Sequence, residues 1–230
     1  MSYRIFPLLF LLFALFACEQ IPVEPLEKRL GLAYAPIEVG RYIIYEVTEK
    51  IYSLSAPMEE KKYQLLERIA ETFEDIQGEN ALRIERFKRN TVTEPWQIDS
   101  VWVAKRTSQL FIKTENNIPY IKLTFPIQEN KTWNGNARNN FSEQTYRMTN
   151  LNQRRRIRNL TFDRTLQVIQ RRDSSLVGLN KQIEIYAENV GLIYKESNVV
   201  TYCSTPNCLG QGIISFGNIT TFQIIAYGQD

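Results

Sequence analysis

Apolar and polar residues alternate along most of the chain beyond residue 40, and this pattern predicts a mainly β protein. The segment 41–48 is dense in β-branched and aromatic residues, which favour strands. The alternation predicts roughly nine strands in all. The further candidate strands are 82–87, 96–105, 109–115, 118–125, 144–151, 162–170, 182–187, 192–202 and 213–227.

The clearest hairpin lies in the middle of the chain. The segments 109–115 and 118–125 are joined by Asn116 and Asn117, and asparagine tolerates the positive φ of a two-residue turn. In the second segment Ile121, Leu123 and Phe125 share one face, whereas Tyr120, Lys122 and Thr124 share the other. The pattern predicts a half-buried antiparallel strand with a polar outer face.

The segment around Leu65 fits two kinds of secondary structure. Leu65, Ile69 and Phe73 recur at helical spacing, yet together with Tyr63 they also fit an alternating strand, which we favour. No repeat of 20 to 50 residues is present, so a solenoid or propeller is not indicated. We expect a single curved antiparallel sheet, either a half-barrel or a β-sandwich.

The N-terminus carries the pattern of an export signal. An unbroken apolar run of 13 residues, 5–17, follows Arg4 and is too short to cross a bilayer, which takes about 20 residues. The run ends at Leu15-Phe16-Ala17-Cys18, which resembles the lipobox of bacterial lipoproteins. The resemblance implies cleavage before Cys18 and acylation of that residue. An ordinary secretory signal or a buried N-terminal helix is the alternative.

The chain therefore divides into three expected parts. Residues 1–17 form a lipoprotein signal peptide, residues 18–39 hold the lipidated Cys18 and a proline-containing tether, and residues 40–230 form the β-rich domain. We expect a location in the bacterial cell envelope, on the outer membrane and facing the periplasm or the surface, with the N-terminal lipid as the membrane contact.

The other two cysteines are expected to form a disulfide. Cys203 and Cys208 are an even pair in an exported domain, outside the reducing cytosol. A zinc site is the alternative, but it needs four ligands and the residues between the cysteines add no good one. We therefore expect neither a metal nor a cofactor.

Charge and composition reduce the number of functional classes to consider. The chain has 28 basic and 25 acidic residues, a net charge of +3 that does not predict nucleic acid as a partner. It contains no histidine, which excludes Ser-His-Asp and Cys-His catalysis and imidazole zinc sites. Only a carboxylate-based hydrolase stays open, through the pairs Glu94 and Asp99 or Glu184 and Glu188, and no catalytic residue is assigned.

A loop rich in amides is the first candidate binding site. Trp133, Asn134, Asn136 and Arg138 combine an indole, amides and a guanidinium, the mixture that sugar-binding surfaces use for stacking and hydrogen bonding. The alternative is a plain turn with Trp133 packed beneath it.

An arginine-rich segment is the second candidate. Arg154, Arg155, Arg156 and Arg158 could bind the phosphate groups of lipids or lipopolysaccharide. A solvated hairpin loop is the alternative, given the near-neutral net charge.

Three stretches resemble a known group of proteins: EIYAENVGLIYK (184–195), ENNIPYIKLTFP (115–126) and Trp133-Asn134-Gly135-Asn136. Together they are similar to uncharacterised lipoproteins of the Bacteroidota with a β-rich periplasmic domain. The likeness covers 40–202 and implies no active site.

Two functions follow for such a domain. The first is a non-catalytic binding module for an apolar or glycan ligand, and the second is a structural lipoprotein that docks on another envelope protein. A deep apolar cavity under the sheet would favour the first, whereas a filled core with an exposed aromatic patch would favour the second.

Overall fold

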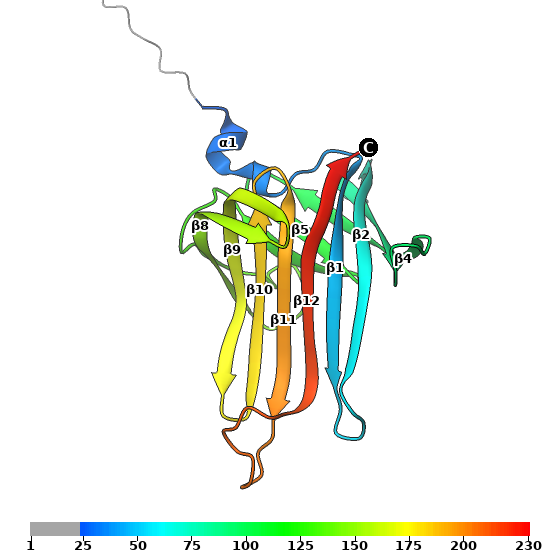
Figure 1. The fold of residues 1–230 in the computed structure, drawn as a ribbon. Helices are drawn as coiled ribbons and strands as arrows, with labels where there is room; N and C mark the ends of the chain where they lie inside the picture. The colour runs from blue at the N-terminus through cyan, green and yellow to red at the C-terminus, as the bar shows by residue number, and fades with distance from the viewer. Residues whose placement is uncertain (1–23) are drawn as a thin grey trace, which may run out of the picture.

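The computed structural model describes residues 24–230, and these form one twelve-stranded antiparallel sheet (Figure 1). The sheet curves until it is nearly closed, like a barrel. Its strands are β1 (Arg41–Tyr52), β2 (Glu59–Glu74), β3 (Asn80–Arg89), β4 (Gln97–Arg106), β5 (Leu110–Glu115), β6 (Ile118–Thr124), β7 (Thr132–Asn134), β8 (Thr145–Ile157), β9 (Leu160–Ser175), β10 (Gly178–Ala187), β11 (Gly191–Tyr202) and β12 (Ile214–Gln229).

The strand order explains the closure. It runs β6-β5-β4-β3-β2-β1-β12-β11-β10-β9-β8-β7, so β6 and β7 are the two edges. The edges meet where the Ile121 amide donates to the Gly135 carbonyl and the Trp133 indole N–H donates to the Ile121 carbonyl, both at 2.9 Å. Two hydrogen bonds therefore join the edge strand β6 to β7 and the residue that follows it.

The predicted fold class is confirmed, with twelve strands instead of roughly nine. The ambiguous segment around Leu65 is strand β2, and Leu65 lies opposite Tyr45 of β1 with both side chains buried. Asn116 and Asn117 have φ values of 50° and 66°, as the two-residue turn between β5 and β6 requires. The three-residue strand β7 is too short to produce an alternating pattern.

Six strands extend past the closed part of the sheet. Figure 1 shows that β1, β2 and β9 to β12 run down together and end in three loops, 53–58, 176–177 and 203–213. We call these loops and the adjoining strand ends the distal end. The C-terminus and the N-terminal helix lie at the opposite end (Figure 1).

The predicted disulfide lies at the distal end. Cys203 and Cys208 are bonded, with their Cα atoms 5.7 Å apart, and close part of the loop between β11 and β12. Beside this loop Gly217 adopts a φ of +123°, and a Cβ there would collide with the carbonyl of Val199. Only glycine lets β11 and β12 approach each other at this point.

The N-terminal segment packs on the domain earlier than the sequence pattern indicates. Helix α1 (Leu26–Leu30) and the 3₁₀ turn η1 (Leu32–Tyr34) lie within the expected tether. Leu32 and Tyr34 are buried in a core cluster with residues of β6, β8, β9 and β10. The packed domain thus starts near Leu32, whereas the signal peptide and Cys18 lie outside the described residues. Within residues 24–230 no helix is long and apolar enough to span a membrane.

Candidate functional site

The interior of the closed part holds a buried network of charges. Lys122 of β6 lies 2.9 Å from Glu184 of β10 and 2.8 Å from Glu115 of β5. Lys195 of β11 lies 3.7 Å from Glu115. The side chains of Lys122 and Glu184 are 5% and 1% exposed, so this network joins strands from both halves of the sheet without solvent screening.

These charges hold one another in their ionised forms. Burial alone would raise the pKa of Glu115, but Lys122, Lys195 and Lys113 outweigh it and bring the pKa well below its usual range. Burial would also raise the pKa of Glu184, and Lys122 and Lys195 lower it. Both carboxylates are therefore ionised at neutral pH.

A second charged network lies beside the first. Glu67 of β2 accepts from Arg86 of β3 at 3.1 Å and from Lys113 of β5 at 2.7 Å. The Arg86 guanidinium lies 3.7 Å from the centre of the Trp102 ring, a cation–π contact. Buried ion pairs of this kind stabilise little by themselves but are costly to break, so they favour one strand register.

The first network corrects one prediction from the sequence. Lys122 and Thr124 were assigned to a polar outer face, but they are 4% and 8% exposed. The strand is buried on both faces because Lys122 meets Glu184 across the interior, while Leu123 packs in the core cluster with Leu32. A lysine in an alternating strand indicates an exposed face unless a carboxylate partner is known, and Glu184 is 62 residues away.

Little space is left inside the closed part. A cavity of about 90 Å³ lies between the charged networks and the N-terminal segment, with Tyr34, Tyr45 and Phe111 among its lining residues. Ligand sites usually measure roughly 300–1,000 Å³. This cavity is therefore smaller than most ligand sites.

A polar cleft opens between the edge strand β6 and the strands β8 to β11. Its volume is about 340 Å³, and three glutamines lie in its wall. We call it the polar cleft; residues lining it include Tyr120, Phe141, Gln144, Gln170, Gln182 and Lys195.

The candidate ligand loop is built mainly as a turn, and one of its residues reaches the polar cleft. The Asn134 Oδ1 accepts from the amides of Asn136 and Gln144 at 2.9 Å and 3.2 Å. The Trp133 ring packs edge-on against Tyr146, with 5.9 Å between ring centres. Asn136 is 5% exposed and lines the polar cleft, whereas Arg138 is exposed on the outside.

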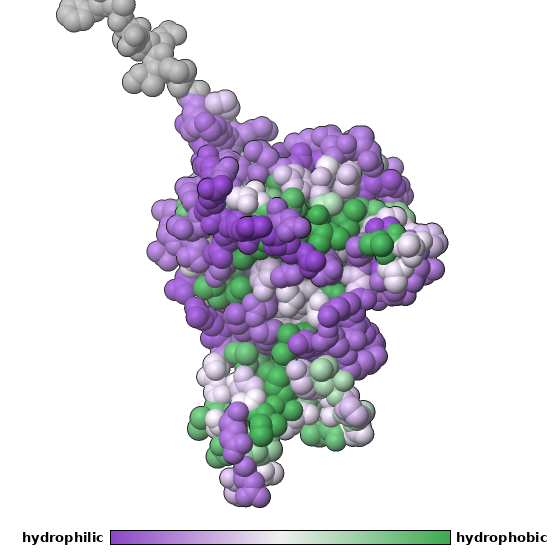
Figure 2. Space-filling view, viewed as in Figure 1, coloured by the Kyte–Doolittle hydropathy of each residue, from purple (hydrophilic) through white to green (hydrophobic). Residues whose placement is uncertain are grey.

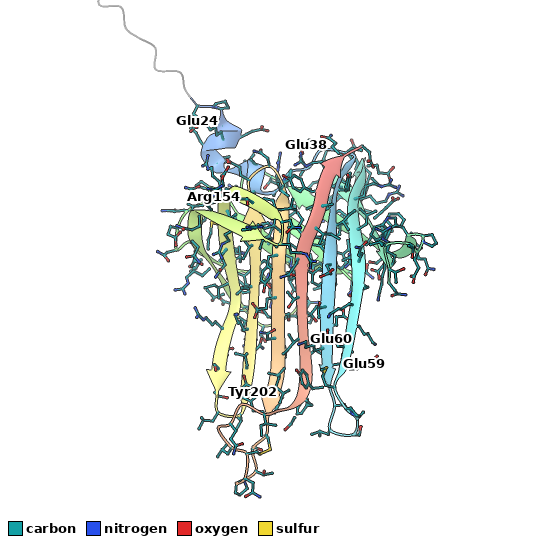
Figure 3. The ribbon with its side chains drawn as sticks, viewed as in Figure 1. Glu24, Glu38, Glu59, Glu60, Arg154 and Tyr202 are labelled. Atoms are coloured by element: carbon teal, nitrogen blue, oxygen red, sulfur yellow. A yellow bond between two sulfur atoms is a disulfide. The ribbon has the colours of Figure 1, made fainter. Side chains whose placement is uncertain are left out.

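The four candidate arginines lie on β8 and the turn that follows it. Arg154 pairs with Asp163 at 3.2 Å, Arg158 pairs with Glu46, and Arg155 donates to Gln167 at 3.3 Å. Arg156 donates to the carbonyl of Arg158 at 3.0 Å. Figure 3 places Arg154 toward the end of the domain that carries Glu24, far from Tyr202 at the distal end.

The two carboxylate pairs are separated into different environments. Asp99 accepts from Arg86 at 3.0 Å, whereas Glu94 accepts from the backbone amide of Asn90 at 3.0 Å. Glu184 is buried in the charged network, and Glu188 pairs with Arg164 at 3.3 Å. Within residues 24–230 no group of three potential metal ligands is present.

The distal end displays an apolar surface that the sequence analysis did not identify. It holds eight of the sixteen large apolar residues that are exposed among residues 24–230, and Figure 2 shows them as a green region at the lower end of the molecule. We call it the distal apolar patch; it consists of Leu54, Met58, Leu176, Val177, Val199, Leu209, Ile213 and Phe216.

Comparison with known proteins found matches among solved structures. No family model and no curated protein matches the chain. A structure from Bacteroides fragilis, described as an exported protein with a YmcC-like fold, has a TM-score of 0.37 and 11% identity, and the match covers 83% of this chain and 98% of that one. A structure from Parabacteroides distasonis, described as a lipoprotein, has a TM-score of 0.39 and 13% identity, covering 85% and 98%.

Proposed function

We propose that the chain is a lipid-anchored envelope protein whose domain docks on another envelope protein through the distal apolar patch. The observation that carries the proposal is the gathering of eight exposed apolar side chains at one end of the domain. Exposed apolar side chains gathered at one end of a domain are typical of an interaction site. The small, charged interior cavity supports docking over storage of an apolar ligand.

The shape of the distal end suits a protein partner. A hollow of about 560 Å³ lies between β9 and β12, with Leu179, Val199 and Phe216 in its lining. Gly178 and Gly217 also line it, and their lack of a side chain lets the strands beneath it approach each other closely. The disulfide restricts the neighbouring loop, which lowers the entropy lost on binding.

The position of the patch argues for a partner away from the anchoring membrane. Figure 3 labels Glu24 at one end of the domain and Tyr202 at the other. Cys18 precedes Glu24 by six residues. A lipid on Cys18 would hold the N-terminal end near the bilayer and direct the distal end outward, toward a protein in the envelope and not toward the anchoring lipid.

Site-directed photo-crosslinking in cells tests the docking. A photoreactive amino acid is placed at Leu176 in the patch and, as a control, at Ile76, which is more exposed (103% against 66%) but lies away from the patch. We expect a single protein adduct of constant mass from position 176 and none from position 76. Phe216→Asp in the same chain is expected to abolish that adduct, because a charge in an apolar contact is costly.

Identification of the adduct completes the test. The purified partner is expected to bind the purified domain, with at least a tenfold loss of affinity for the Phe216→Asp variant. An adduct of twice the chain mass would show that the patch joins two copies of this protein, and a lipid adduct would show membrane contact. Either result, or equal crosslinking from both positions, would overturn the proposal.

A further inference from the structure

We propose that the polar cleft binds an uncharged saccharide, at a site separate from the distal apolar patch. The observation that carries this inference is the buried amide of Gln170. Its residue is 6% exposed, and its Nε2 has no hydrogen-bond partner in the protein. A buried donor without a partner costs about 1–3 kcal/mol, and a ligand hydroxyl or carbonyl would satisfy it.

Gln170 lies at a bulge in β9 and lines the polar cleft. Leu166 and Val168 are fully buried in the core cluster that also contains Tyr146 and Met148. Gln170 comes two residues later, at a bulge in the register between β9 and β10, and it is buried as they are. It lines the polar cleft together with Tyr146, a member of that core cluster.

Neighbouring groups supply the other contacts that a sugar ring needs. Gln144 donates to the Gln170 carbonyl at 3.1 Å, and Gln182 donates to the Asn180 side chain at 3.0 Å, so both amides are held in place beside the cleft. Phe141 lies in the lining with 55% of its surface exposed, available as a stacking platform. Fixed amides together with an exposed aromatic ring are the groups by which proteins recognise saccharides.

The charges around the polar cleft are balanced, and this selects an uncharged ligand. Lys122 and Lys195 face Glu115 and Glu184 in the buried network, and Glu196 pairs with Lys181 at 2.8 Å. A charged ligand would have to displace one of these partners and leave a buried charge uncompensated. Uncharged hydroxyl and acetamido groups can bind without displacing either partner of an ion pair.

Nuclear magnetic resonance titrations of the full domain test the inference. The probes are the uncharged tetrasaccharides chitotetraose, maltotetraose and mannotetraose, with a tetramer of galacturonic acid as the charged comparison. We expect saturation transfer from the protein to at least one uncharged probe. Gln170→Leu is expected to weaken that binding about tenfold, the value of one hydrogen bond to a buried amide.

A matched variant and a second measurement separate binding from folding. Gln223→Leu makes the same change on β12, outside the polar cleft, and is expected to leave the affinity unchanged. Gln170→Leu is expected to keep or raise the urea midpoint of unfolding, because it removes an unpartnered amide. A large fall in that midpoint would show a structural role for Gln170 and overturn the inference.

The binding data have equally clear contrary outcomes. Absence of transfer to all three uncharged probes at millimolar concentration, preference for the charged tetramer, or equal affinity of the Gln170→Leu variant would each overturn it. Phe216→Asp is expected to leave saccharide binding intact, so failure of the docking proposal and failure of this inference are distinguishable.

Discussion

Lys122 on the edge strand β6 and Glu184 on β10 meet inside the sheet, with 2.9 Å between Nζ and Oε1. Eight places separate these strands in the sheet order, so the contact exists only because the sheet curves back on itself. Tyr186 donates to the other carboxylate oxygen of Glu184 at 2.6 Å. The carboxylate therefore has a partner on each oxygen, which offsets the cost of burying it.

Removing the lysine of this pair is expected to destabilise the domain strongly. Lys122→Met leaves the Glu184 carboxylate buried with its main counter-ion gone, a loss of about 3–5 kcal/mol in the free energy of unfolding by urea. The double variant Lys122→Met with Glu184→Gln is expected to recover part of the loss, since the uncompensated charge is gone. Arg154→Ala, which breaks an exposed pair, is the control and is expected to cost far less. If Lys122→Met and Arg154→Ala lose the same free energy of unfolding, burial does not decide the cost of breaking an ion pair.

The lowered pKa values of the interior carboxylates predict a loss of stability in acid. Glu115 and Glu184 have folded-state pKa values below their ordinary value of 4.5, so the folded state binds fewer protons than the unfolded state as the pH falls. Their contribution to the free energy of unfolding is complete above pH 4.5. It declines as the pH falls from 4.5 through the pKa values of the folded state. Urea unfolding between pH 7 and pH 3 measures the decline. The Glu115→Gln variant is expected to be less stable at pH 7 but to lose less on acidification, and an unchanged slope would refute the assignment.

Reduction of the disulfide is expected to lower stability modestly. The Cys203–Cys208 bond closes a six-residue loop, for which chain entropy gives about 2 kcal/mol. The urea midpoint of the native domain is therefore expected to fall when dithiothreitol is added. The Cys203→Ala, Cys208→Ala double variant starts at the lower midpoint and is expected not to respond to the reductant. If the urea midpoint of the native domain does not change when the reductant is added, the bond contributes no measurable stability.

Lipidation at Cys18 is the prediction that concerns the membrane anchor. Mass spectrometry of protein extracted from membranes is expected to find the chain starting at Cys18 with acyl chains attached, because the residues before it resemble a lipobox. Cys18→Ser is expected to move the protein out of the membrane fraction, whereas Cys203→Ser is not. An intact N-terminus or a free thiol at position 18 would contradict this prediction.

Local features of the domain could be predicted because neighbouring residues decide them. Alternation placed most strands, and Asn116 with Asn117 marked a turn because asparagine tolerates positive φ. The disulfide followed from counting, since only Cys203 and Cys208 remain once Cys18 is assigned to the lipid. None of these inferences requires knowledge of which strands lie side by side.

The tertiary structure decided the rest, because closure brings distant residues together. The pattern around Lys122 indicated an exposed face, and only the return of β10 across the interior supplies Glu184 as its partner. In the sequence, Gln170 is one more polar residue in an alternating strand. Only in the folded domain do the edge strand β6 and the loop at Phe141 form a cleft beside it. The loops 53–58, 176–177 and 203–213 are each unremarkable in sequence. They form one apolar surface because alternate turns of an antiparallel sheet lie at the same end, and the strands leading to them extend beyond the closed part.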